Sequence, residues 1–265
     1  MLKINNISKT FNPGTVNEKK ALNNLSLELE KGDFVTILGS NGAGKSTLFG
    51  AIAGSFVVDS GSVYLDGRNI TNLPDYKRSK FIGRLFQDPL KGTAPSMTIE
   101  ENLALAYMRA SSGTSPFSVI TRKDRENFRE RLAQLGLGLE DRMNHPVGLL
   151  SGGQRQALTL LMATLVTPKL LLLDEHTAAL DPATAEKVLS LTERIVAENR
   201  ITCLMITHSI PSALALGNRT IMMHNGSVVL ELAGEERSGM TTGELLKIFH
   251  QQSISSDRIL FSADL

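Results

Sequence analysis

A nine-residue segment at positions 39–47 constrains the fold of this chain more than any other feature. It reads Gly-Ser-Asn-Gly-Ala-Gly-Lys-Ser-Thr and lies between an apolar run, Phe34–Leu38, and a segment of helical character, Lys45–Ala53. Its glycines permit backbone angles that turn successive N–H groups toward one point, and a helix that begins there adds the positive end of its dipole. The segment predicts a strand, a phosphate-binding loop and a helix, in that order.

Two side chains of this loop have direct chemical roles. Lys45 places a positive charge on the β and γ phosphates of a nucleotide, and Ser46 offers a hydroxyl to Mg²⁺. The predicted nucleotide-binding residues of the loop are Gly39, Ser40, Asn41, Gly42, Ala43, Gly44, Lys45, Ser46 and Thr47.

A second motif places two carboxylates directly after a buried strand. Four leucines at positions 170–173 are followed by Asp174 and Glu175. Because side chains alternate along a strand, the two acids can do different work at its end. Asp174 is suited to holding Mg²⁺ and Glu175 to polarising the water that attacks the γ-phosphate. The alternative is an acidic loop start, which the phosphate loop makes less favourable.

A third motif, Ser151-Gly152-Gly153-Gln154, opens a helix with a serine and two glycines whose amides can face an anion. The plain alternative, Ser151 as a helix N-cap, is compatible with this role. One γ-phosphate needs one such cradle. Two cradles in one chain indicate that two chains face each other.

The rest of the chain alternates short apolar runs with longer segments of helical period, which indicates an α/β fold. We expect strands at residues 2–7, 25–29, 34–38, 81–86, 170–174 and 201–207, with hairpins at 61–70 and 220–232. We expect helices at residues 45–53, 151–166, 182–198 and 242–250, a helical insert at 98–136 and an exposed loop at 110–116.

Composition excludes several classes of protein. The 28 Lys and Arg residues against 27 Asp and Glu give a net charge of +1, too small for the positive field of a nucleic-acid binder. The one cysteine, Cys203, allows neither an internal disulfide nor a cysteine-rich metal centre. The first residues lack the long apolar stretch that is typical of a signal peptide, and no apolar run approaches the roughly 18 residues that span a bilayer. At 265 residues, one domain with a subdomain is expected.

These motifs, in this order, resemble the nucleotide-binding subunit of the ATP-binding cassette (ABC) family. The resemblance extends from about residue 2 to residue 232. It implies a P-loop ATPase core with an antiparallel β subdomain and a helical subdomain. Residues 1–232 would form one domain, with the helical subdomain inserted at about 88–165, and residues 233–265 a short C-terminal helix and tail.

The resemblance assigns further residues. Phe11 corresponds to the aromatic residue on which adenine stacks, Gln87 to a glutamine that senses Mg²⁺, and His208 to a histidine at the γ-phosphate. Each has a plainer interpretation, as a core or loop aromatic, a turn residue and a structural histidine. The predicted catalytic residues are Glu175, His208, Lys45 and Gln87. Further predicted nucleotide contacts are Phe11, Ser151, Gly152, Gly153, Gln154 and Asp181. The predicted metal ligands are Ser46, Gln87 and Asp174.

The resemblance also implies partners. Two copies would form a head-to-tail dimer around two MgATP and drive a transmembrane permease, docking through residues 92–101, at the inner face of the cell membrane. We expect import of an amino acid or a similar small solute, with an extracytoplasmic solute-binding protein. The alternatives are an ABC ATPase of the iron–sulfur assembly type and a non-hydrolysing, nucleotide-gated interaction module.

The chain departs from the family pattern at two positions. His176 replaces the usual proline after Glu175, and Ala178 replaces a common serine. Neither change removes a catalytic group. We expect His176 to alter only the shape or pH response of this loop, so that a His176→Pro variant loses less than about tenfold in ATPase rate, about 1.4 kcal/mol.

Overall fold

The computed structural model describes residues 1–110 and 120–249, apart from the side chain of residue 110. The chain divides into two compact units, Met1–Asp75 with Thr202–Leu265 (unit 1) and Tyr76–Ile201 (unit 2), and each is described by itself. Within the described residues, no helix combines the length and the apolar character needed to cross a membrane.

Unit 1 contains an antiparallel sheet in the order β2-β1-β4-β5. Its strands are β1 (Leu2–Phe11), β2 (Lys19–Leu29), β4 (Ser60–Leu65) and β5 (Arg68–Asn69). The turn between β4 and β5 is Asp66-Gly67, where both residues have positive φ, 49° and 74°. Two consecutive positive φ angles match the right-handed twist of a hairpin, as the Asp-Gly pair predicts.

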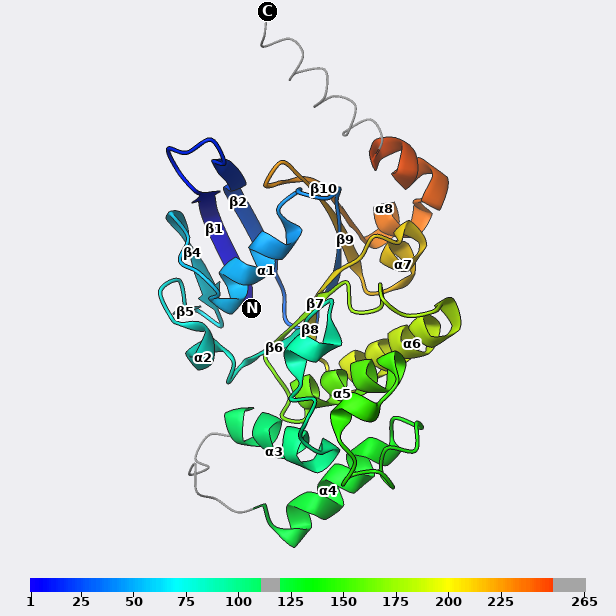
Figure 1. The fold of residues 1–265 in the computed structure, drawn as a ribbon. Coiled ribbons are helices and arrows are strands. Elements are labelled where there is room, and N and C mark those ends of the chain that lie inside the picture. The colour runs from blue at the N-terminus through cyan, green and yellow to red at the C-terminus, as the bar shows by residue number, and fades with distance from the viewer. Residues whose placement is uncertain (111–119, 250–265) are drawn as a thin grey trace, which may run out of the picture. The chain divides into compact units, whose positions relative to one another are not determined.

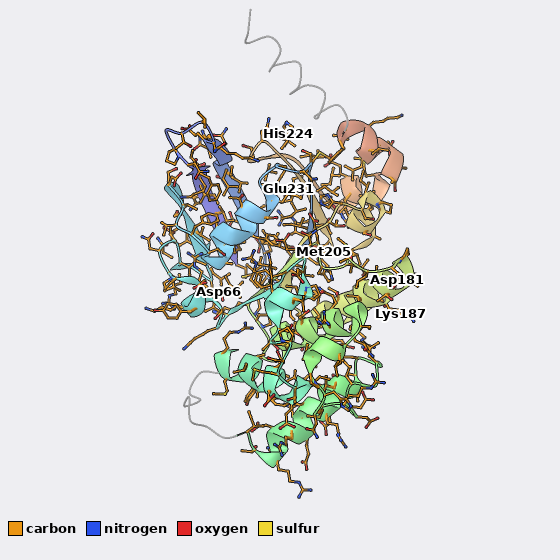
Figure 2. All side chains as sticks on the ribbon, viewed as in Figure 1. Asp66, Asp181, Lys187, Met205, His224 and Glu231 are labelled. Atoms are coloured by element: carbon orange, nitrogen blue, oxygen red, sulfur yellow. The ribbon has the colours of Figure 1, made fainter. Side chains whose placement is uncertain are left out.

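Four further strands of unit 1 run in the order β10-β9-β3-β8. The strand β3 (Phe34–Leu38) is parallel to β8 (Thr202–Ile206) and to β9 (Arg219–His224), and β9 pairs antiparallel with β10 (Ser227–Ala233). Every residue of β3 and β8 is buried, as their largely apolar sequences predict. His224 and Glu231 mark the β9 and β10 hairpin in Figure 2, where Met205 marks β8.

The helices of unit 1 are α1 (Lys45–Ala53), α7 (Ile210–Ala215), α8 (Gly234–Gly239) and a last helix at residues 242–249. Figure 1 shows α7 and α8 beside the β9 and β10 hairpin. Leu38, Met222, Leu232 and Leu245 form an apolar core between these strands and the last helix. This core fixes the position of β3, and with it the start of the phosphate loop.

Unit 2 combines two parallel strands with a group of helices, coloured cyan-green to yellow in Figure 1. The strands are β6 (Ile82–Leu85) and β7 (Leu170–Asp174). The helices are α3 (Ile99–Ala110), α4 (Arg122–Ala133), α5 (Gly152–Thr164) and α6 (Pro182–Glu198), with the 3-10 helices η1 (Pro89–Gly92) and η2 (Val147–Leu149). A short helix, α2 (Asp75–Arg78), begins at the last residue of the first part of unit 1.

Most expected elements are present, and the differences have physical causes. The strands β1 and β2 are longer than expected because register shifts between Ile4 and Thr10 interrupt the two-residue period of buried side chains. The helix α8 was not expected, since its sequence, Gly-Glu-Glu-Arg-Ser-Gly, has no apolar face. The loop expected at 110–116 lies outside the described residues, except that residue 110 ends α3. The division into a domain at residues 1–232, a helical subdomain inserted at about 88–165 and a C-terminal helix and tail at 233–265 stays a prediction.

Candidate nucleotide site

The phosphate loop of unit 1 joins the end of β3 to the start of α1. Lys45 is buried, with only 6% of the residue exposed. Its Nζ donates hydrogen bonds to the carbonyl oxygens of Gly39 (2.7 Å) and Ser40 (3.1 Å). The ammonium group therefore lies against the backbone of the loop, while Asn41 and Gly42 are exposed.

Close packing behind the loop explains the glycine at position 44. Gly44 has a φ of +99°, and a Cβ there would lie 2.5 Å from the carbonyl oxygen of Ala21. On the same side, the N–H of Gly226, in the turn between β9 and β10, donates to the carbonyl oxygen of Ala43 at 3.0 Å. A side chain at position 44 would push the loop away from both supports.

The N-terminus of α1 has no side-chain cap and no acidic residue in its first turn. By contrast, the N-termini of α4, α5, α6 and α7 are each capped by a serine, threonine or aspartate side chain. A helix N-terminus carries partial positive charge, which favours an anion. Together with Lys45 and the loop glycines, it forms a cradle suited to the phosphates of a nucleotide.

Two further predicted residues belong to unit 1. His208 follows β8, and because Thr207 donates its N–H to the carbonyl oxygen of Ile37 (3.1 Å), the ends of β8 and β3 lie side by side. His208 is exposed. Phe11, at the end of β1, is half-buried and packs edge-to-face on Phe56, with ring centroids 5.4 Å apart. It is neither a core residue nor a freely exposed ring.

In unit 2, the parallel strands β6 and β7 bring three predicted residues to one sheet edge. Leu85 pairs with Leu173, so Gln87 and the pair Asp174 and Glu175 follow neighbouring strand ends. Gln87 is exposed and Asp174 is buried. An Asp174 oxygen lies 4.0 Å from a guanidinium nitrogen of Arg84. Burial lowers the pKa of Arg84, and the Asp174 carboxylate opposes this effect.

Glu175 has an unusual backbone conformation, with a φ of +47°. A left-handed conformation costs a non-glycine residue about 1–2 kcal/mol and persists where the surrounding structure enforces it. Such strain is concentrated at functional sites. Because this strain depends on the fold around β7, the sequence alone does not predict it, and it independently favours Glu175 as a functional residue.

The Ser151 motif begins α5, and its side chains form a capping box. The Ser151 hydroxyl accepts from the N–H of Gln154 (3.3 Å), and the Gln154 side chain accepts from the N–H of Ser151 (3.2 Å). Gly153 is buried against α6, because a Cβ there would lie 2.2 Å from Cγ2 of Thr184. The capping role of Ser151 is confirmed, and its phosphate role stays a prediction.

Asp181, labelled in Figure 2, directly precedes α6. Its carboxylate accepts the N–H of Thr184 at 3.0 Å, so it caps the helix. Hydrogen bonds from Thr184 hold the pKa of the Asp181 carboxyl below its usual range. Its expected contact with the nucleotide or with a second copy stays a prediction.

His176, which departs from the family pattern, directly follows Glu175 and is buried. Its Nε2 lies 3.1 Å from the hydroxyl of Thr192, and that hydroxyl donates to the carbonyl oxygen of Val188 (2.8 Å). The proton of the first bond therefore belongs to Nε2. Burial lowers the pKa of His176 to about 4, so the ring is neutral at pH 7.

The residues predicted to hold Mg²⁺ all offer oxygen ligands, which fits this ion. Ser46 contributes a hydroxyl, Gln87 an amide oxygen and Asp174 a carboxylate; Ser46 and Gln87 are exposed. The described part of the chain has no group of three or more His, Cys, Asp or Glu side chains that could hold a metal. Mg²⁺ is commonly bound by one or two protein groups together with phosphates and water.

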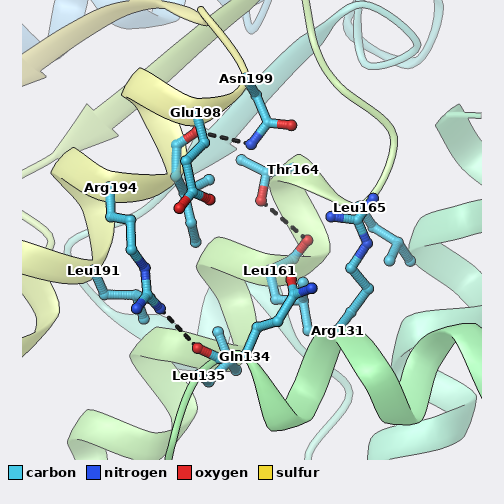
Figure 3. A pocket seen from close by; sticks show the side chains of 11 residues that line it. Arg131, Gln134, Leu135, Leu161, Thr164, Leu165, Leu191, Arg194, Glu198 and Asn199 are labelled. Atoms are coloured by element: carbon cyan, nitrogen blue, oxygen red, sulfur yellow. Dashed lines mark hydrogen bonds between the residues drawn. The ribbon is translucent and has the colours of Figure 1, made fainter.

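A cavity of about 350 Å³ lies elsewhere in unit 2, where the ends of α4 and α5 approach α6 (Figure 3). Arg194 crosses it and donates to the carbonyl oxygen of Gln134 at 2.7 Å. Its lining residues are Arg131, Gln134, Leu135, Leu161, Thr164, Leu165, Leu191, Arg194, Ile195, Glu198 and Asn199. None of these is a predicted site residue, so the site does not depend on this cavity.

Comparison with known proteins identifies the family. The family described as ABC transporter matches residues 22–178. The chain belongs to the ABC transporter family. A tyrosine transport ATP-binding protein of Clostridioides difficile is 46% identical over 94% of this chain and 98% of the relative. A putative ABC transporter ATP-binding protein of Bacillus cereus is 34% identical over 86% of this chain, which spans only 39% of that relative.

Solved structures of ABC cassettes have the same fold. A dimeric, post-hydrolysis structure of an ATP-binding cassette bound to ADP and phosphate matches with a TM-score of 0.75 and 32% identity, over 88% of this chain and 98% of that chain. The expected α/β P-loop fold is thereby confirmed. The chain is an ATP-binding subunit of an ABC transporter and an ATPase, which sets aside the non-hydrolysing module. The roles of single residues stay predictions.

Proposed function

We propose that this ABC subunit hydrolyses ATP to drive import of an amino acid, of the aromatic class, through a separate membrane permease. One observation carries the choice of solute: the tyrosine transport ATP-binding protein matches this chain over nearly the full length of both proteins. In this proposal the solute does not contact the ATPase subunit, so no residue of this chain recognises the solute.

In the proposed reaction, the phosphate loop binds ATP and the side chains around it assist attack by water. Lys45 holds the β and γ phosphates, Glu175 polarises the water, and His208 contacts the γ-phosphate. Mg²⁺, held by Ser46, Gln87 and Asp174, would neutralise charge that develops on the phosphates. The exposure of His208 and the strained backbone of Glu175 support these roles. Phe11 would stack on adenine.

The proposal includes a head-to-tail dimer with two ATP molecules. The start of α5, Ser151 to Gln154, would face the phosphate loop of the second copy, with Asp181 nearby. The exposure of Ser151 and Gly152 supports this arrangement, and so does the dimeric state of the solved cassette. A Glu175→Gln variant should then accumulate the ATP-bound dimer.

Residues 92–101 are the proposed docking segment for the permease, at the inner face of the cell membrane. The buried side chain of Asn102 holds this segment, since it accepts the N–H of Ala94 (2.8 Å) and donates to the carbonyl oxygens of Ala94 (3.1 Å) and Thr98 (2.9 Å). Leu90, just before it, is 45% exposed and offers an apolar contact. A solute-binding protein outside the membrane would deliver the amino acid.

Uptake of labelled tyrosine tests the function. In cells that lack this chain, the wild-type protein should restore uptake, and Glu175→Gln, expressed at the same level, should not. Unlabelled tyrosine and phenylalanine should compete, whereas unlabelled lysine should not. Uptake that is independent of the chain, or competition by lysine alone, would contradict the proposed solute. Copurification with a cytosolic scaffold instead of a permease would favour the iron–sulfur assembly alternative.

A further inference from the structure

A second lysine of unit 1 reaches the phosphate loop from outside. Lys19 is the first residue of β2, and its Nζ lies 3.3 Å from the position that a Cβ on Gly42 would occupy. In the β1 and β2 pairing, Lys19 stands opposite Phe11. Residues directly opposite in an antiparallel pair share one face of the sheet. The Lys19 and Phe11 side chains therefore leave the sheet on the same face, and Lys19 extends to the loop.

Two other sources of positive charge belong to the loop that Lys19 reaches. The ammonium group of Lys45 already lies against Gly39 and Ser40 of the same loop, and the N-terminus of α1 follows without an acidic residue in its first turn. No Asp or Glu side chain of the described residues lies within ion-pair distance of the Lys19 ammonium group. Like charges placed together repel each other unless an anion lies between them. The loop therefore carries more positive charge than its own lysine supplies.

We propose that Lys19 binds the phosphate chain of the nucleotide at Gly42, as a second basic contact beside Lys45. The loop amides of this motif hold the α and β phosphates, so a cation at Gly42 favours nucleotides that carry at least two phosphates. The inference rests on the proposed binding of ATP at this loop. Lys19 lies outside the phosphate-loop motif, 20 positions before its first residue, Gly39.

The neighbouring residue, Lys20, provides a matched control. It stands opposite Thr10 in the same pairing, and successive residues of a strand point to opposite faces. Both lysines are exposed. Replacing either one by methionine removes one positive charge from the same exposed strand, but only Lys19→Met removes it from the loop.

Binding of ADP and ATP to the purified chain, measured by titration calorimetry, tests this inference. For Lys19→Met we expect the Kd for both nucleotides to rise about five- to tenfold at low salt, the range of a partly exposed charged hydrogen bond. The rise should shrink at high salt because ions screen an exposed contact. Lys20→Met should bind like the wild type, and Lys19→Arg should recover most of the affinity.

The possible outcomes separate this inference from the function on which it rests. A Lys19→Met protein that binds ADP and ATP as tightly as Lys20→Met would overturn the inference, and so would a loss of equal size at low and high salt. Lys45→Ala should abolish binding; if it does not, the proposed nucleotide site itself is wrong. Equal midpoint temperatures of thermal unfolding for Lys19→Met and Lys20→Met would show that a loss of nucleotide affinity is not caused by a folding defect.

Discussion

At the scale of single residues, burial decides which of the unusual side chains can respond to pH. His176 was expected to change the shape or the pH response of the loop after Glu175. Its ring is buried, hydrogen-bonded to Thr192 and neutral at pH 7. A response of His176 itself is thus confined to acidic solution, and the small effect expected for His176→Pro stays a prediction.

The pKa of His176 predicts acid destabilisation. Burial lowers it from 6.5 to about 4, so between these pH values the unfolded chain binds a proton that the folded chain does not. Protonation of His176 does not lower the free energy of unfolding above pH 6.5. As the pH falls toward 4, it lowers the free energy of unfolding by about 3 kcal/mol in all. Urea unfolding at pH 7 and pH 4.5 should show a smaller loss of stability in His176→Gln than in wild type. Equal losses would contradict the assigned pKa.

At the scale of elements, the contact between α5 and α6 depends on the absence of a side chain at Gly153. A Cβ there would lie 2.2 Å from Cγ2 of Thr184. We expect Gly153→Ala to lower the free energy of unfolding by about 1–3 kcal/mol, the usual range for overpacking. Urea unfolding measures the change.

A double-mutant cycle isolates this contact. Thr184→Ser removes the methyl group that would collide, so Gly153→Ala should cost much less in that background. Gly239→Ala is the control, because nothing lies within 4 Å of the added Cβ. An equal cost of Gly153→Ala with threonine and with serine at position 184 would show that the collision is relieved in another way.

Local sequence predicted the elements that have strong, uninterrupted signals. The strands Phe34–Leu38 and Leu170–Asp174 and the helices Lys45–Ala53 and Pro182–Glu198 have the expected bounds, because apolar runs, glycines and caps mark their ends. Features that depend on distant residues were not predictable. The contact of Gly226 with Ala43, the approach of Lys19 to Gly42 and the strain at Glu175 all arise from the tertiary fold.

At the scale of the whole molecule, the two nucleotide-binding motifs predict that activity depends on association. If the phosphate loop of one copy works with Ser151 of another, the ATPase rate per chain should rise with protein concentration until the dimer is saturated. Phosphate release measured over a dilution series checks this expectation, with Glu175→Gln as the inactive control. A constant rate per chain down to the lowest concentration would contradict a shared site.

The support behind the phosphate loop joins an early part of the chain to a late one. Gly226 donates to Ala43, and the N–H of Phe34, at the start of β3, donates to the side chain of Asn218, 184 residues later. At the usual rate of protein synthesis, about ten to forty seconds separate the appearance of these partners. During that time the ribosome holds a chain whose phosphate loop is complete in sequence but lacks its support. ATP, as a ligand of the folded form, would then bind and stabilise unit 1 only after its last strands have been made.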